Sequence, residues 1–88
     1  MHHCELVVRN PKDSSHWIHR PIFLPEIPRA GEKLVITLIQ DDEEKDIDLC
    51  IFAVEHIFDT RTKIFYTRLD CSGTSLDFQI LEKVSKPL

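Results

Sequence analysis

The sequence predicts a small all-β domain, an SH3-like barrel of five to six strands, and three observations support this. Its 88 residues suit one domain spanning residues 1–88, and 42% hydrophobic with 30% charged residues is typical of a globular chain. Short segments of alternating or β-branched apolar residues recur along the chain, separated by turn-forming residues. Closing such strands into a barrel removes exposed sheet edges. An OB-like or split barrel is the second topology, with a short C-terminal helix left open.

The first two strands flank a polar turn. Residues 4–9 are rich in β-branched side chains, and residues 10–15 consist of turn formers. Residues 17–24 form a second extended segment that contains Pro21. Because proline lacks an amide hydrogen, this segment is expected to be an edge strand or to carry a bulge.

A connector and a third strand follow. Residues 25–32 contain two prolines and Gly31, which favour extended backbone and a positive φ respectively. Residues 33–39 then place apolar side chains on both faces of a strand. This pattern predicts a mostly buried strand.

An acidic segment, residues 41–46, precedes the longest strand. Like charges at this density must be solvated, so the segment is expected at a hairpin tip. The strand over residues 47–58 exceeds the usual strand length, so we expect it to bend sharply and to serve two regions of the sheet. Even-numbered residues from 48 to 58 would share one face and odd-numbered residues the other. Residues 59–62 predict a tight hairpin, and residues 63–70 the returning strand.

The C-terminal pattern supports two structures. Residues 71–75 are expected to form a loop. Leu76, Phe78 and Ile80 alternate as in a strand, whereas Leu76, Ile80 and Val84 have helical spacing behind Ser75 as a cap. The strand is the preferred reading of residues 76–84, and the helix is the alternative.

Two stretches support a resemblance. Leu24-Pro25 and the run from Pro28 to Leu34 are followed, after the acidic segment, by the run from Ala53 to Asp59. Over residues 24–70 the chain resembles small uncharacterised bacterial and phage β-barrel proteins that have a Pro-x-x-Gly-Glu turn and a Val-x-His strand. The resemblance implies a barrel and a bacterial or phage origin, and it implies no activity.

Residues capable of catalysis or metal binding do not form a recognisable motif. Three cysteines at wide spacings predict free, partly buried thiols, although a Cys4–Cys71 or Cys50–Cys71 bridge stays open. Cys71, near a glycine, is the thiol expected to be exposed. His16 and His19 would lie on opposite strand faces and could not share a metal ion there. We therefore expect no catalytic residue, no metal site and no cofactor, with metal binding by the N-terminal histidines left open.

Charge is the most informative feature for function. Residues 41–59 contain eight acidic side chains against one lysine, a net charge of −7 in a chain whose total is −4. Such a surface suits a protein partner with a basic surface, although it would equally keep a hairpin tip soluble. The expected partner-binding residues are the acidic ones, with Trp17 and Phe23 as apolar contacts: Asp41, Asp42, Glu43, Glu44, Asp46 and Asp48.

The sequence thus predicts a non-enzymatic protein-binding module. In its sharper form, the protein is a phage or mobile-element inhibitor that occupies the positive groove of a nucleic-acid enzyme. The alternative is a nucleic-acid-binding barrel with a basic face formed by Arg20, Arg29, Arg61, Lys63 and Arg68. With no signal-peptide pattern and no apolar run of about 20 residues, a cytoplasmic location and no membrane association are expected. A homodimer formed through an edge strand stays open.

Overall fold

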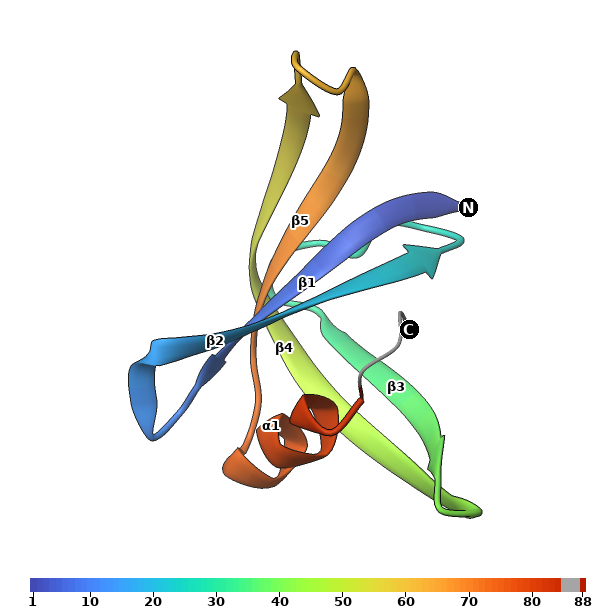
Figure 1. Ribbon diagram of the computed structural model, residues 1–88, viewed down its shortest axis with the longest axis vertical. Coiled ribbons are helices and arrows are strands. Elements are labelled where there is room, and N and C mark those ends of the chain that lie inside the picture. The colour runs from blue at the N-terminus through green and yellow to red at the C-terminus, as the bar shows by residue number, and fades with distance from the viewer. Residues whose placement is uncertain (85–87) are drawn as a thin grey trace.

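The computed structural model describes residues 1–84 and 88 and arranges them as one five-stranded sheet with a C-terminal helix against it (Figure 1). The mostly β fold with a short C-terminal helix is therefore confirmed. No helix among the described residues is long and apolar enough to cross a membrane. The elements are β1 (His2–Asn10), β2 (Asp13–Leu24), β3 (Lys33–Gln40), β4 (Glu43–Asp59), β5 (Ile64–Ser72) and α1 (Ser75–Glu82).

The strands follow the order β2-β1-β5-β4-β3, with β1 and β5 parallel and the other pairs antiparallel. β2 is an edge strand, as Pro21 predicted. The Pro21 carbonyl accepts a hydrogen bond from the Leu88 amide (2.9 Å), so its backbone polar groups face away from β1 and no ladder bond is lost. Since β2 and β3 form the two edges, closure into an SH3-like barrel stays a prediction.

One face of the curved sheet forms the hydrophobic core. β1, β4 and β5 supply its centre, and α1 covers it with Phe78 and Leu81. The side chains that enter the core alternate along β1, along β5 and along β4 as far as Ile51. The fully buried side chains of the three strands in this core include Cys4, Leu6, Val8, Ile47, Leu49, Ile51, Leu69 and Cys71.

The long strand β4 serves two partners, as predicted from its length. It pairs with β3 through residues 43–50 and with β5 through residues 50–59. A register shift between Ile51 and Ala53 inserts Phe52 as an extra residue, and beyond it Val54 rather than Ala53 packs against the core. The predicted division of residues 47–58 into two uniform faces is therefore wrong after Phe52, because a bulge exchanges the faces.

The prediction that β3 is mostly buried is also wrong. Its side chains alternate between half-buried and exposed, and Ile39 is 82% exposed. The cause is its place as the last strand in the sheet, with one face against the core and the other in solvent.

The C-terminal segment is a helix rather than the preferred strand. Thr74, not Ser75, is its N-cap. The Thr74 hydroxyl accepts a hydrogen bond from the Asp77 amide (3.1 Å), while the Asp77 carboxylate accepts one from the Thr74 amide (3.0 Å). This reciprocal capping box defines the helix start, and residues 71 and 72, expected in a loop, complete β5.

Candidate functional site

The acidic segment forms the tip and one strand of the β3–β4 hairpin, here called the acidic hairpin (residues 33–48). Asp41 and Asp42 form its two-residue turn and both have positive φ, 54° and 62°. A two-residue turn with two positive φ values matches the right-handed twist of its strands, and aspartate tolerates this conformation. The prediction of a solvated tip is confirmed, since residues 41–44 are all exposed.

Carboxylates line the outer face of this hairpin. Because Ile47 and Leu49 point into the core, the alternating residues Glu44, Asp46 and Asp48 point outward, about 7 Å apart at the usual strand rise. Within the described residues, none of these three forms an ion pair with a lysine or arginine. The row is therefore free to attract a cationic group.

The outer face also carries apolar side chains from β3. Val35 lies opposite Asp48, and Ile39 lies opposite Glu44. Both are exposed, and Thr37 between them donates a hydrogen bond from Oγ1 to Asp46 Oδ1 (2.7 Å). An apolar row on the edge strand thus runs beside an acidic row on its neighbour.

Trp17 and Phe23 lie on β2, at the opposite edge of the sheet from β3. The Arg9 guanidinium lies 4.2 Å from the Trp17 ring centroid, and Phe23 stacks on His3 with centroids 5.2 Å apart. Six residues of extended strand separate them by about 20 Å. The structure therefore brings neither next to the acidic hairpin, and the two aromatic residues do not form one cluster.

The residues of the predicted basic face are scattered. Arg20 serves the fold, because its Nε donates to the Val84 carbonyl (2.7 Å) and another nitrogen to the His19 carbonyl (2.8 Å). Arg68 pairs with Asp70 (2.9 Å), and this hydrogen bond raises the pKa of Arg68. Arg29 is in the connector, and only Arg61 and Lys63 share a turn.

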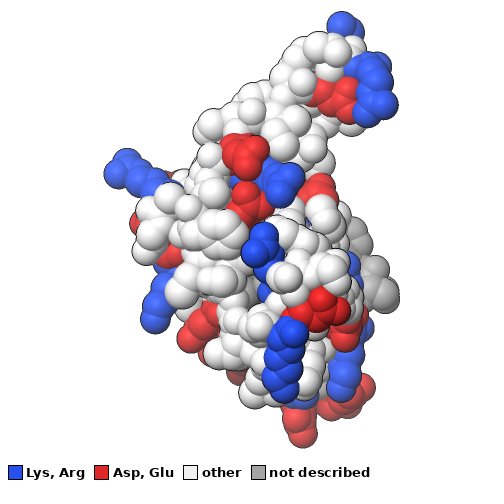
Figure 2. All heavy atoms as spheres, turned by 90° about the vertical axis from the view of Figure 1, so that its left-hand side faces the viewer, with Lys and Arg blue, Asp and Glu red and all other residues white. Residues whose placement is uncertain are grey.

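Sequence reasoning missed one feature, the projecting end of the β4–β5 hairpin, here called the arm (residues 52–68). It extends from the body at the top of Figure 1, and Figure 2 shows it largely uncharged between its charged end and the body. Phe58 and Phe65 form a cross-strand pair and are 55% and 59% exposed. His56 stacks over Phe65 at 6.1 Å and lies 3.1 Å from the Thr67 hydroxyl through Nδ1. The signal in the sequence was the apolar pair flanking a turn.

The end of the arm has a small charged cluster. Asp59 accepts hydrogen bonds from the amide and guanidinium of Arg61, and these bonds lower the pKa of Asp59. Lys63 has a positive φ of 60° in the same turn. With Arg61 paired to Asp59, the turn keeps a net positive charge from Lys63.

The thiols differ from one prediction. All three are free, but Cys71 is buried and Cys50 is exposed, so the expected exposed thiol was the wrong one. Cys71 is buried because it belongs to β5 rather than to the loop expected over residues 71–75. This burial raises the pKa of the Cys71 thiol to about 12. A lone exposed Cys50 has no base within hydrogen-bonding distance among the described contacts.

The histidines confirm the prediction of opposite faces. His16 contacts Phe78 edge-on and lies 3.3 Å from a Glu82 oxygen, whereas His19 faces outward, 3.2 Å from Glu5. Within the described part of the chain, no group of three or more His, Cys, Asp or Glu residues is placed to hold a metal ion.

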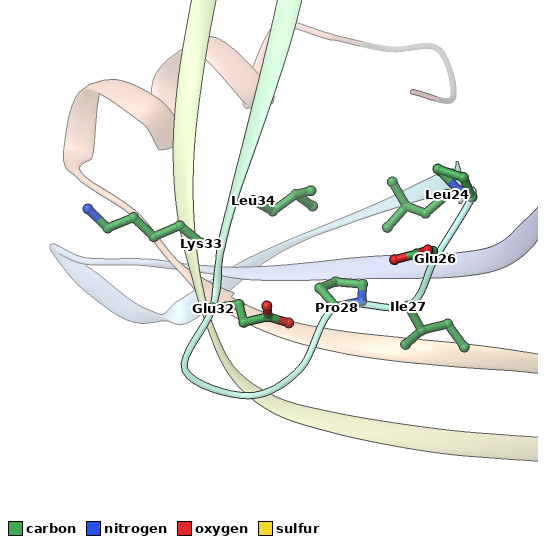
Figure 3. A pocket seen from close by; sticks show the side chains of 8 residues that line it. Leu24, Glu26, Ile27, Pro28, Glu32, Lys33 and Leu34 are labelled. Carbon is green, nitrogen blue, oxygen red and sulfur yellow. The ribbon is translucent and has the colours of Figure 1, made fainter.

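The connector between β2 and β3 borders an open groove of about 380 Å³. Leu24 and Leu34 face each other across it, and the Glu26 and Glu32 carboxylates point into it from opposite sides (Figure 3). The groove is thus apolar at one end and acidic at its rim.

No protein-family model, no curated protein and no solved structure matches this chain.

Proposed function

We propose that this chain is a non-enzymatic protein-binding module that docks a basic segment of a partner on the outer edge of β3. The observation that carries the proposal is the exposed apolar row of β3 beside the β4 carboxylates of Glu44, Asp46 and Asp48, which form no ion pair with a lysine or arginine of the described residues. β3 is the last strand of the sheet, and no backbone group in the described residues pairs with its outer edge. An extended partner segment could add to this edge as a further strand.

The acidic row defines the chemistry of the partner. A strand added beside β3 would be separated by β3 from the β4 carboxylates of Glu44 and Asp48. Lysine or arginine side chains can cross that distance, with their aliphatic stems covering Val35 and Ile39 and their charges reaching the carboxylates. An acidic or neutral strand would leave this row without counter-charges.

The narrower form of the proposal makes the partner a nucleic-acid enzyme and the protein a phage or mobile-element inhibitor. What supports it is the regular spacing of Glu44, Asp46 and Asp48 along one face of β4, a row of negative charge like that of a nucleic-acid backbone. Such an inhibitor would displace bound duplex DNA from a nucleic-acid enzyme of its host.

The proposal is tested with a fluorescein-labelled peptide of alternating lysine and valine, measured by fluorescence anisotropy. The test variant is Glu44→Lys/Asp48→Lys, which leaves the hydrogen bond of Asp46 intact. The matched control is Asp13→Lys/Glu82→Lys, which changes the net charge equally but on exposed residues outside the hairpin. Far-ultraviolet circular dichroism checks that both variants fold.

We expect the hairpin variant to bind at least about tenfold more weakly, since it loses two attractions and gains two repulsions worth several tenths of a kcal/mol each. The control should bind within about twofold of the original chain, and the difference should shrink at high salt. If peptide binding weakened equally in both variants, net charge alone would explain the effect and the proposal would be refuted. A preference for duplex DNA over the peptide would also refute it.

A further inference from the structure

The arm has an unpaired edge of its own, separate from that of β3. On the side of β4 that faces β3, pairing with β3 ends at residue 50, and the connector takes residue 51. The Gly31 amide donates to the Ile51 carbonyl (2.7 Å), and the Ile51 amide donates to the Glu32 carbonyl (2.9 Å). From Phe52 to Asp59, no backbone group in the described residues occupies that edge.

Beyond the bulge at Phe52, this edge carries few of the devices that protect edge strands. Protected edges carry lysine, proline or an inward charge, but between Phe52 and Phe58 the only carboxylate is Glu55 and there is no lysine or proline. β1 stops pairing with β5 at Thr67, so beyond it the arm is a two-stranded ribbon. Such a ribbon is marginal alone in water, and this one also exposes Phe58, Ile64 and Phe65.

We propose that residues 52–59 pair antiparallel with the same residues of a second copy of this chain, forming one continuous sheet across a two-fold axis. Centring the axis on His56 places Val54 of each copy opposite Phe58 of the other. It also keeps Glu55 from lying opposite itself, which would oppose like charges. The same patch then serves both copies, as a two-fold interface requires.

Charge distinguishes a second copy from other occupants. The edge of β3 would place two acidic rows close together if it paired with itself, whereas residues 52–59 carry two carboxylates, Glu55 and Asp59, of which Asp59 is paired with Arg61. The arm edge offers a basic segment the single carboxylate of Glu55 in place of a row of carboxylates. The arm edge therefore suits an identical edge, and the β3 edge suits a basic one.

The end of the arm adds a complementary contact. In the antiparallel arrangement, residue 60 of one copy lies opposite Phe52 of the other. The turn at residues 60–63 then extends toward the connector of that other copy, whose Gly31 and Glu32 form hydrogen bonds with Ile51, the next residue along β4. Arg61 and Lys63 then approach the Glu26 and Glu32 carboxylates that point into the connector groove (Figure 3). The two-fold axis makes this contact twice.

Sedimentation equilibrium across a concentration series measures the mass of the intact chain. We expect twice the monomer mass of 10.3 kDa at the higher concentrations. Phe58→Glu should give a monomer, because it buries a carboxylate in the interface. The matched control is Phe23→Glu, whose phenylalanine is 54% exposed on the opposite edge strand, and it should remain a dimer.

A charge exchange tests the second contact. Arg61→Glu/Lys63→Glu and Glu26→Lys/Glu32→Lys should each weaken the dimer about tenfold. Mixing them should restore both connector contacts in a mixed dimer, one with the original charges and one with the charges reversed. A monomer at every concentration would overturn the proposal, as would a dimer that survives Phe58→Glu but dissociates with Val35→Glu. The first result would still leave binding at the β3 edge intact, so the two proposals fail separately.

Discussion

The helix α1 carries two leucines in opposite environments, so the stability change expected on truncating each of them can be worked out from the structure. Leu81 is fully buried against the sheet, whereas Leu76 is 64% exposed on the same helix. Leu81→Ala removes three buried carbons and leaves a cavity, a change that costs about 2–5 kcal/mol in protein cores. The whole chain should have a free energy of unfolding of roughly 4–13 kcal/mol, so the variant would lose a large share of its stability.

Urea denaturation followed by circular dichroism, at one protein concentration, measures this loss. For a central urea slope of about 2 kcal/mol per molar, the midpoint of Leu81→Ala should fall by about 1–2.5 M. Leu76→Ala is the matched control and should change the free energy of unfolding by no more than about 0.5 kcal/mol. Equal shifts in the two variants would show that α1 does not cover the core and would refute the packing described here.

Three further predictions concern stability. Burial raises the pKa of the Cys71 thiol to about 12 from the ordinary 9.0, so the thiol loses its proton at lower pH in the unfolded chain than in the folded one. The free energy of unfolding should therefore fall between these two pH values, by up to about 1.4 kcal/mol per pH unit. Denaturation curves of Cys71→Ala should show a flatter dependence on pH. Arg20→Lys should cost about 1–3 kcal/mol in thermal unfolding, because one ammonium nitrogen replaces the two separate guanidinium nitrogens that donate to the Val84 and His19 carbonyls; an unchanged midpoint would contradict this. Asp42→Gly should stabilise the turn by several tenths of a kcal/mol, since Asp42 has φ 62°, whereas Asp42→Val should destabilise it; the reverse order would disprove the turn assignment.

Much of the fold could be predicted from period-two patterning. The strands near residues 4–9, 17–24 and 47–58 follow from alternating or β-branched residues, and Pro21 correctly indicated an edge. Strand order could not be predicted, and the burial of β3 depends on it. A continuous apolar strand is buried on both faces only where it has neighbours on both sides and a layer over each face.

The remaining errors arise where a local pattern supports two structures. The bulge at Phe52 changes which residues face the core without any marker in the sequence. The helix over residues 75–82 competed with a strand because Leu76, Phe78 and Ile80 alternate as in a strand, whereas Leu76, Ile80 and Val84 have helical spacing. The capping pair Thr74 and Asp77 was the overlooked signal.

The candidate site was predictable in part. Charge density alone placed residues 41–44 at a solvated hairpin tip, because unpaired charges cannot be buried. The separation of Trp17 and Phe23 from this hairpin, and the scatter of the arginines, depend on tertiary structure. The arm was not predicted because an apolar pair such as Phe58 and Phe65 usually indicates a core. Only the ends of the β1 and β3 ladders show that no third strand among the described residues pairs with this part of the hairpin.

The most direct test of the proposed function is amide hydrogen exchange, with and without the lysine–valine peptide. The account predicts that the peptide slows exchange at the outward-facing amides of residues 33–40, and that Glu44→Lys/Asp48→Lys abolishes this protection. Protection confined to β2, to α1 or to the turn at residues 60–63, or none at all, would contradict it.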